Sequence, residues 1–409
     1  MPLSWQIFRP QCFRRAFLTA IFNFGDSSMF SLHFKCNFFR AIRKLFAAVV
    51  SAVLATHAAY AQDIVLGQSV ALSGPAQELG KEMLLGAKTY FDQVNAAGGV
   101  RGRKIILKTL DDGYEPPRAE ANTRQFVEDA DILALFGYVG TPTSAASIPL
   151  AIKAKVPFFG AFTGAELLRT PMNRYVINVR ASYFDETETI VRQMTQGGIT
   201  KIAVFYQNDS YGQAGLSGVE KALAKRSLQV TAKATVERNS TDVAAALATM
   251  LAAKPEVIVM ISAYSSCAEF IKQAKAKQLA TQFVNVSFVG TRALAKALGP
   301  AADGVIISQV MPPPTANKFP VVVDYQKALR AAGVTDFSYT SLEGYIVARV
   351  FVEALRRGGD ASRDALVRAL ESMRNVDVGG FSVNLSPDNH NASRFVEMTV
   401  LNKAGEVRY

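Results

Sequence analysis

Short apolar runs rich in β-branched residues alternate with amphipathic helical stretches along most of this chain. Residues 64–70 have the composition of a strand, and residues 81–95 have a helical periodicity that ends at Gly98 and Gly99. The same order continues through 105–110, a helix from Pro117, 132–136, a helix from Pro142, and 156–159. Strands and helices at this spacing predict parallel sheets built of βαβ units.

The second half of the chain starts the same alternation again and then abandons it. A helix is expected from Asp185. Further strands are expected at 201–206, 229–235, 257–262, 283–287 and 304–307, with helices at 212–224, 243–253 and 265–277. After three consecutive prolines come helical stretches at 321–332, 341–357 and 360–373 and short β runs at 381–385 and 395–401. This order predicts a chain that crosses between two α/β lobes.

The first 61 residues have the layout of a secretory signal peptide. A basic segment at 40–44 precedes a short apolar segment at 45–54, and Ala59-Tyr60-Ala61 supplies the small residues of a cleavage site. We therefore expect cleavage after Ala61 and a mature protein in the periplasm. The stretch before Met29 is unusual for such a leader, which favours a translation start at Met29 over a genuinely long leader.

The net charge of +11 belongs largely to this leader. It holds seven of the 45 basic residues and one of the 34 acidic residues. The other basic residues are spread through helical stretches without an arginine-rich block, so no nucleic acid is expected as a partner. Cys12 and Cys36 also precede the cleavage site, which leaves Cys267 without a disulfide partner. We expect Cys267 to be a small packed apolar residue.

The remainder of the chain has no motif that indicates catalysis. It lacks a Gly-x-Ser-x-Gly elbow, a His-Glu-x-x-His pair and a glycine-rich phosphate loop. His390 lies in a turn-like segment, where a surface residue is a better interpretation than a base. Asp111 and Asp112 are adjacent at the end of an extended run, so their side chains point opposite ways and a solvated turn is expected. The sequence therefore predicts a protein that is not an enzyme and that binds no cofactor and no metal.

Polar residues gather where predicted strands end, and ligands of open α/β sheets collect at that edge. Thr141 and Pro142 follow the strand at 132–136. Threonine suits a helix N-cap and proline suits the first helical position, so free N–H groups and hydroxyls would face outward together. Such a helix terminus binds a carboxylate readily. A cap that binds nothing is the alternative.

Three segments near the expected mature N-terminus resemble those of a known family. They read ALSGP at 71–75, VNAAGGVRGRK at 94–104 and DDGYEPPR at 111–118. An exported chain with these segments resembles the type I periplasmic binding proteins, and among them the leucine/isoleucine/valine-binding branch that feeds ABC importers. The resemblance runs from about Asp63 to the C-terminus.

This resemblance implies an α/β fold of two Rossmann-like lobes with parallel sheets, joined by a three-segment hinge. Residues 62–183 and 311–375 would form lobe 1, and residues 184–310 and 376–409 would form lobe 2. The implied function is the periplasmic substrate-binding component of an ABC importer for amino acids or similar carboxylate or amide solutes. A periplasmic sensor that reports to a membrane receptor or kinase is the alternative. The expected partners of this monomer are a small solute and the ABC permease complex of the inner membrane.

The resemblance also implies where the solute binds, by closure of the lobes. Thr141 would hold the solute's carboxylate, and Thr163 is the nearest hydroxyl in a second contact segment that includes Phe162. Tyr211 matches the family's tyrosine after the first strand of lobe 2. Two aromatic positions of the family fall at Leu79 and at Tyr264 or its neighbour Ala263.

One position departs from the family. Ser287 stands where an acidic residue would pair with the ammonium group of an amino acid. Losing that charge-assisted contact removes ~1.5–3 kcal/mol of binding energy, so plain branched-chain amino acids are expected to bind poorly. Glu343 could supply the charge from the other lobe, although an acidic residue in the first turn of a helix is the simpler explanation.

Overall fold

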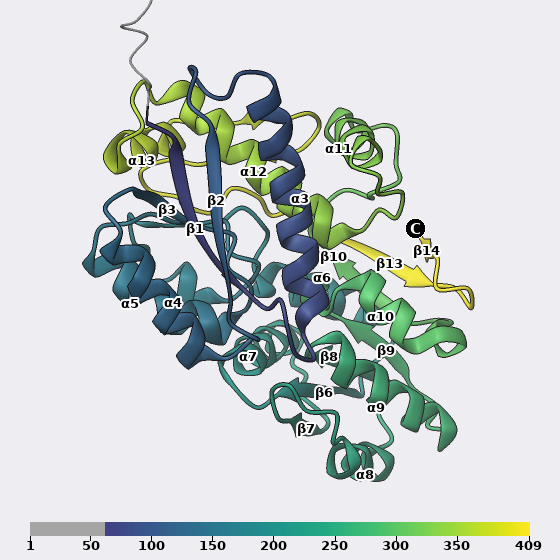
Figure 1. Ribbon diagram of the computed structural model, residues 1–409. Helices are drawn as coiled ribbons and strands as arrows, with labels where there is room; N and C mark the ends of the chain where they lie inside the picture. Colours follow the sequence, from purple (N-terminus) through teal and green to yellow (C-terminus); the bar gives the residue numbers. More distant parts are fainter. Residues whose placement is uncertain (1–61) are drawn as a thin grey trace, which may run out of the picture. The chain divides into compact units, whose positions relative to one another are not determined.

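The computed structural model describes residues 62–409, so the leader, its cleavage site and the start at Met29 lie outside the described residues. Within that range the chain forms two large sheets with helices on both faces of each (Figure 1). The helices of residues 62–409 include none that is both long enough and apolar enough to span a membrane.

The first sheet is entirely parallel, with the strand order β2-β1-β3-β4-β5. Its strands are β1 (Ile64–Val70), β2 (Ile105–Asp111), β3 (Ile132–Phe136), β4 (Phe158–Phe159) and β5 (Val176–Ile177). The five residues of β3 are all buried, as expected of a strand covered by helices on both sides.

Helices from distant parts of the chain cover this sheet. On one face α4 (Pro116–Glu128) contacts α5 (Thr141–Lys153), while α3 (Gln77–Ala96) and α12 (Tyr339–Arg357) pack against each other (Figure 1). The ring of Phe351 on α12 lies 5.7 Å from that of Phe136 and 5.2 Å from that of Phe159. A helix near the C-terminus therefore completes the core that the N-terminal strands begin.

The second sheet has the order β14-β13-β10-β9-β8-β6-β7. The central strands β6 to β10 are parallel, and β13 and β14 form an antiparallel edge. The bounds are β6 (Ile202–Gln207), β7 (Lys233–Val236), β8 (Val257–Ile261), β9 (Gln282–Asn285), β10 (Ile306–Gln309), β13 (Glu397–Leu401) and β14 (Val407–Arg408).

Alternate residues of these strands enter two different cores. On β8, Val257 and Val259 join the core that includes α6 (Tyr183–Gln196) and α7 (Ser210–Ala224). Ile258 joins a second core on the opposite face. The helices of that second face are α8 (Ala244–Ala253), α9 (Tyr264–Ala276) and α10 (Thr291–Leu298). The period of two along a strand thus fills both faces of the sheet.

We call the first sheet with α3, α4, α5 and α12 lobe 1, and the second sheet with α6 to α10 lobe 2. Lobe 1 also includes α11 (Pro320–Ala331), which contacts α3 and α12, and α13 (Arg363–Glu371), which contacts α12. A separate pair, β11 (Val376–Asp377) with β12 (Ser382–Val383), precedes β13. The predicted α/β class with parallel sheets is confirmed, whereas the crossing points at 183, 310 and 375 stay predictions.

Two residues expected in solvated turns are buried. His390 is held because the loop around it pairs with the end of β5, where its carbonyl accepts from Asn178 N at 2.9 Å. Asp112 is buried because it accepts from Ser69 Oγ and from Tyr114 N, each at 2.8 Å. Cys267 is buried, as expected.

Candidate functional site

The two threonines of the predicted site lie side by side in lobe 1. Thr141 begins α5 after β3, Thr163 follows β4, and their Oγ1 atoms are 2.7 Å apart. Both residues are fully buried. The expectation that Thr141 is the N-cap is wrong: the cap position is Gly140, with φ 101°, and the Thr141 hydroxyl is engaged by Thr163 instead.

Tyr183 and Tyr211 connect the threonine pair to lobe 2. Thr163 Oγ1 donates to Tyr183 OH at 3.4 Å, and the Tyr183 ring lies 5.4 Å from the ring of Tyr211. Asp209 caps α7 by accepting from Tyr211 N at 2.9 Å, which fixes Tyr211 in the first turn of that helix. The hydroxyl of Tyr211 is buried and has no hydrogen-bond partner among the residues described.

The ring of Phe288 lies between the lobes. It belongs to a short 3-10 turn, Ser287–Val289, directly after β9. Its ring centroid is 4.5 Å from that of Tyr211, 5.3 Å from that of Phe162 and 6.0 Å from that of Tyr114. Phe288 was not among the site residues predicted from the sequence, although it adjoins Ser287.

A buried arginine connects the charged members of the site. Arg180 follows β5, its Cζ lies 4.7 Å from the centroid of the Phe162 ring, and its Nη2 donates to Ser287 Oγ. Its Nη1 is 3.5 Å from Glu343 Oε1, and its Nη2 is 3.4 Å from Glu186 Oε1. All these side chains are buried. Arg180 was not predicted from the sequence, where the available signal was a basic residue directly after the short, mostly apolar segment 176–179.

Glu186 holds Ser287 in place. Its carboxylate accepts from Ser287 N at 2.8 Å, from Ser287 Oγ at 3.0 Å and from Ser308 Oγ at 2.5 Å. Glu186 lies in the first turn of α6, whose start is fixed by a capping box between Ser182 and Asp185. Glu186 was not singled out from the sequence, because acidic residues are common in first turns.

Glu343 is the second carboxyl group at Arg180. It was explained in the sequence as an acidic residue of a helix's first turn, but it lies beyond that turn of α12 and is 3% exposed. Burial raises the pKa of Glu343 to about 7, and Arg180 opposes this rise. Burial alone would lower the pKa of Arg180, but Glu343 and Glu186 raise it overall, so the guanidinium stays cationic.

Leu79 and Tyr264 lie in other hollows of the surface. Leu79 lines a small hollow together with Glu82 and Arg292. Tyr264 lines an open groove of about 840 Å³ together with Arg292 and Glu78. The contacts just described bring together the other six predicted residues, Thr141, Phe162, Thr163, Tyr211, Ser287 and Glu343, and leave Leu79 and Tyr264 out.

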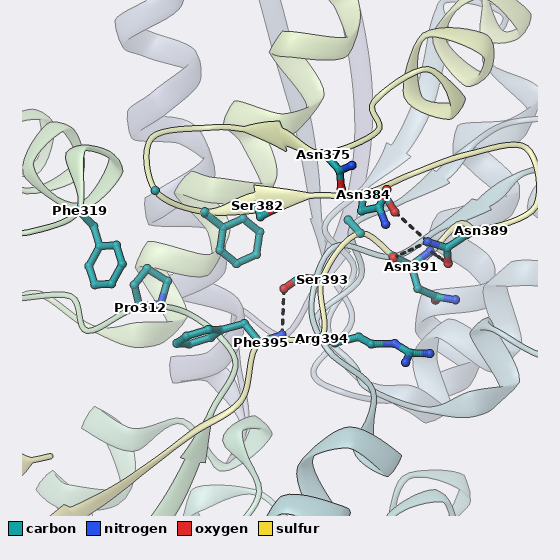
Figure 2. Close-up of a pocket in the computed structure, with 13 residues that line it drawn as sticks. Pro312, Phe319, Asn375, Ser382, Asn384, Asn389, Asn391, Ser393, Arg394 and Phe395 are labelled. Carbon is teal, nitrogen blue, oxygen red and sulfur yellow. Dashed lines mark hydrogen bonds between the residues drawn. The ribbon is translucent and has the colours of Figure 1, made fainter.

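A cavity of about 460 Å³ contains none of the predicted site residues. Figure 2 shows Phe319, Pro312 and Phe395 on one side of it and a group of asparagines on the other. Some of these side-chain amides form hydrogen bonds within their own loop. Asn389 Nδ2, for example, donates to the carbonyl of Asn384 at 2.7 Å. Within residues 62–409 no group of three His, Cys, Asp or Glu side chains could hold a metal ion.

Comparison with known proteins gives a consistent result. The model of a periplasmic binding protein family matches residues 63–406. A Leu/Ile/Val-binding protein homolog 7 of Brucella suis biovar 1 is 26% identical over 379 residues, which are 86% of this chain and 92% of the relative. Two solved structures are also similar. One, a possible leucine/isoleucine/valine-binding protein from Rhodopirellula baltica SH 1, has a TM-score of 0.82 and 37% identity over 85% of this chain and 96% of its own. The other, a substrate-binding periplasmic protein from Ralstonia solanacearum, has a TM-score of 0.80 and 32% identity over 84% and 99%.

Proposed function

We propose a function from the premise that this chain belongs to the periplasmic binding protein family. Its relatives are solute-binding proteins, and the chain is likewise a binding protein and not an enzyme. We propose that it is the periplasmic substrate-binding component of an ABC importer for small carboxylate or amide solutes, amino acids included.

The observation that carries this proposal is the buried group of polar and aromatic side chains shared by both lobes. Thr141 and Thr163 come from lobe 1, whereas Tyr211 and Ser287 come from lobe 2. Small-solute sites are mostly apolar clefts with a few polar groups at fixed places, and two-lobed receptors enclose the solute by hinge closure. In the proposed site, Phe162 and Glu343 would contact the solute together with these residues, whereas Leu79 and Tyr264 line other hollows.

Contacts on two sides of this group support a closed form of the protein. On one side Arg238 of lobe 2 lies 2.9 Å from Glu115 of lobe 1, and Asn239 Nδ2 donates to Glu115 at 2.7 Å. On another side Arg292 of α10 lies 2.6 Å from Asp336 and also pairs with Glu82 of α3. The closed form is the state that we expect the permease to recognise.

A solute screen by thermal unfolding tests the proposal. The panel holds amino acids, 2-oxo acids, aromatic acids and amides. A solute at about 100 times its dissociation constant stabilises the folded form by ~2.7 kcal/mol, which gives a clear rise in melting temperature. The same solute should reduce the radius of gyration in X-ray scattering because the lobes close.

Transport is tested separately from binding. Uptake of the labelled solute into cells should be lost when the gene is deleted and restored by the wild-type gene. A variant that folds but does not bind in the screen should fail to restore uptake. If no member of the panel raises the melting temperature or compacts the protein, the proposed function is wrong.

A further inference from the structure

Arg180 is a fully buried cation that the surrounding protein satisfies only in part. A guanidinium carries five N–H donors, and burying it is unfavourable unless acceptors replace its hydration. Its Nη2 is used by Ser287 and Glu186, but Nε and Nη1 have no hydrogen-bond partner within residues 62–409. Buried donors without a partner mark a place where another group supplies the acceptor.

The neighbouring carboxylates do not fill this need. Glu186 already accepts three hydrogen bonds from Ser287 and Ser308. Glu343 Oε1 lies 3.5 Å from Nη1, beyond the usual range of an N–H···O bond, and has no hydrogen-bond partner itself. An acceptor that reaches Nη1 or Nε directly would therefore improve the contacts of the guanidinium.

The charges around Arg180 favour an anion as that acceptor. A second buried guanidinium, Arg169, donates to the carbonyl of Arg180 at 3.1 Å. The carboxyl groups beside Arg180 are those of Glu186 and Glu343, whereas Arg169 also faces Glu166 and Asp185. Because burial raises the pKa of Glu343 to about 7, part of the protein near neutral pH holds Glu343 as the neutral acid. Arg180 then keeps only Glu186 as a carboxylate partner, and the oxygens of Glu186 also accept from Ser287 and Ser308.

The same surroundings disfavour a second cation and supply an apolar wall. A solute ammonium group beside Arg180 would be repelled by it, and the oxygens of Glu186 are occupied. The Phe162 ring lies against the guanidinium of Arg180, and the centroid of the Phe288 ring is 5.3 Å from that of Phe162. The apolar part of a solute bound at Arg180 would therefore contact aromatic rings. Arginine stacked on an aromatic face is well suited to recognise a carboxylate.

We propose, resting on the function proposed above, that Arg180 binds the carboxylate of the solute and that the preferred solutes are carboxylic acids without an α-ammonium group. The solute class is thus that of 2-oxo acids and aliphatic or aromatic monocarboxylic acids. Arg180 provides within the protein the positive charge that an amino acid would carry itself.

Matched pairs of solutes test this inference directly. L-leucine and 4-methyl-2-oxopentanoate differ only in an ammonium or oxo group, and so do L-phenylalanine and phenylpyruvate. Titration calorimetry at pH 7 should show at least one oxo acid binding at least tenfold more tightly than its amino acid. If the amino acid binds more tightly in both pairs, or if neither oxo acid binds, the inference is overturned.

Variants of Arg180 show whether this residue is the reason. Arg180→Met should weaken binding of the preferred acid at least hundredfold, and Arg180→Lys should weaken it at least tenfold, because lysine lacks the planar donor set. Arg192→Met is the control, because Arg192 is an exposed arginine on α6, the helix that follows Arg180 in the chain, and its loss should change nothing. Circular dichroism shows whether each variant folds. If Arg180→Met does not fold, the affinity of Arg180→Lys tests the inference by itself.

The outcomes separate this inference from the proposed function. Tight binding of an L-amino acid that persists in Arg180→Lys and is lost in Glu343→Gln would place the charge recognition at Glu343. That result overturns the role of Arg180 but leaves solute capture intact. Binding of the oxo acid that Arg180→Lys leaves unchanged would also exclude Arg180.

Discussion

At the scale of single residues, the hydroxyl pair of Thr141 and Thr163 is the part of the site with the clearest chemistry. The two groups share one hydrogen bond at 2.7 Å, and Thr163 also makes a long 3.4 Å bond to Tyr183 OH. When Thr163 donates to Thr141 in place of Tyr183, the hydrogen of Thr141 can be donated to a ligand oxygen. Thr141→Val keeps the shape of the side chain and removes that donor. We expect binding of the preferred solute to weaken by about 1–3 kcal/mol in calorimetry.

The control for this change is Thr249→Val on the exposed surface of α8. This change also removes a threonine hydroxyl, but outside the proposed site. The variant's affinity for the solute should therefore match that of the wild type. An unchanged affinity in Thr141→Val would remove Thr141 from the site.

Glu343 gives a pH dependence with a definite sign. Burial raises its pKa to about 7 from the ordinary 4.5, so between these pH values the folded protein holds a proton that the unfolded chain has released. The free energy of unfolding therefore falls as pH rises through this window, by up to about 3 kcal/mol. In Glu343→Gln this fall should be much smaller in urea unfolding at pH 5 and pH 8.

Asp112 contributes a slope of the same sign, because burial raises its pKa to about 6. Some dependence on pH should thus remain in Glu343→Gln. The difference between the two proteins isolates Glu343, and equal slopes in both would contradict its protonation in the folded state.

At the scale of elements, α3 and α12 approach so closely that a glycine is needed between them. A Cβ added at Gly86 of α3 would lie 1.7 Å from the carbonyl oxygen of Ser341 on α12. Gly86→Ala gains helix propensity, but the backbone contact forces the helices apart. We expect a loss of about 1–3 kcal/mol in urea unfolding.

Lys81→Ala, at an exposed position of α3, is the control for helix propensity and should change stability little. Because α12 carries Glu343, Gly86→Ala should also weaken solute binding, whereas Lys81→Ala should not. Full stability in Gly86→Ala would show that the two helices can separate without loss.

The elements also show how far the sequence could predict the structure. The strands 64–70 and 132–136 were predicted to the residue, because buried β runs bounded by helices have a clear pattern. The strand β5 was missed because two residues have no periodicity. The role of Arg180 was missed for a different reason: it depends on Ser287 and Glu343, which only the tertiary structure brings to it.

At the scale of the whole molecule, the contacts between the lobes should set how long a solute stays bound. The pair of Arg238 and Glu115 is partly exposed, and such pairs contribute ~0–1 kcal/mol. Arg238→Met should therefore raise the dissociation rate by no more than about fivefold, with little effect on association. Stopped-flow measurements at low and high salt should show that the difference in dissociation rate between the variant and the wild type becomes smaller as the salt concentration rises.

The control is Lys108→Met, which removes a pair of similar exposure, with Asp129, inside lobe 1. That pair does not join the lobes, so its loss should leave dissociation unchanged. An equal effect from both variants would mean that Arg238 does not act through closure.

The late position of α12 and β13 in the chain has a consequence for the timing of folding. Until α12 has been synthesised, β3 and β4 lack the helix that contributes Phe351 to their core. Until β13 has been synthesised, β10 lacks one of its two neighbouring strands. Neither lobe can therefore complete its core before nearly all of the polypeptide is available, and contacts this distant in sequence form slowly. The topology itself thus delays the completion of both cores until these late segments of the chain have been synthesised.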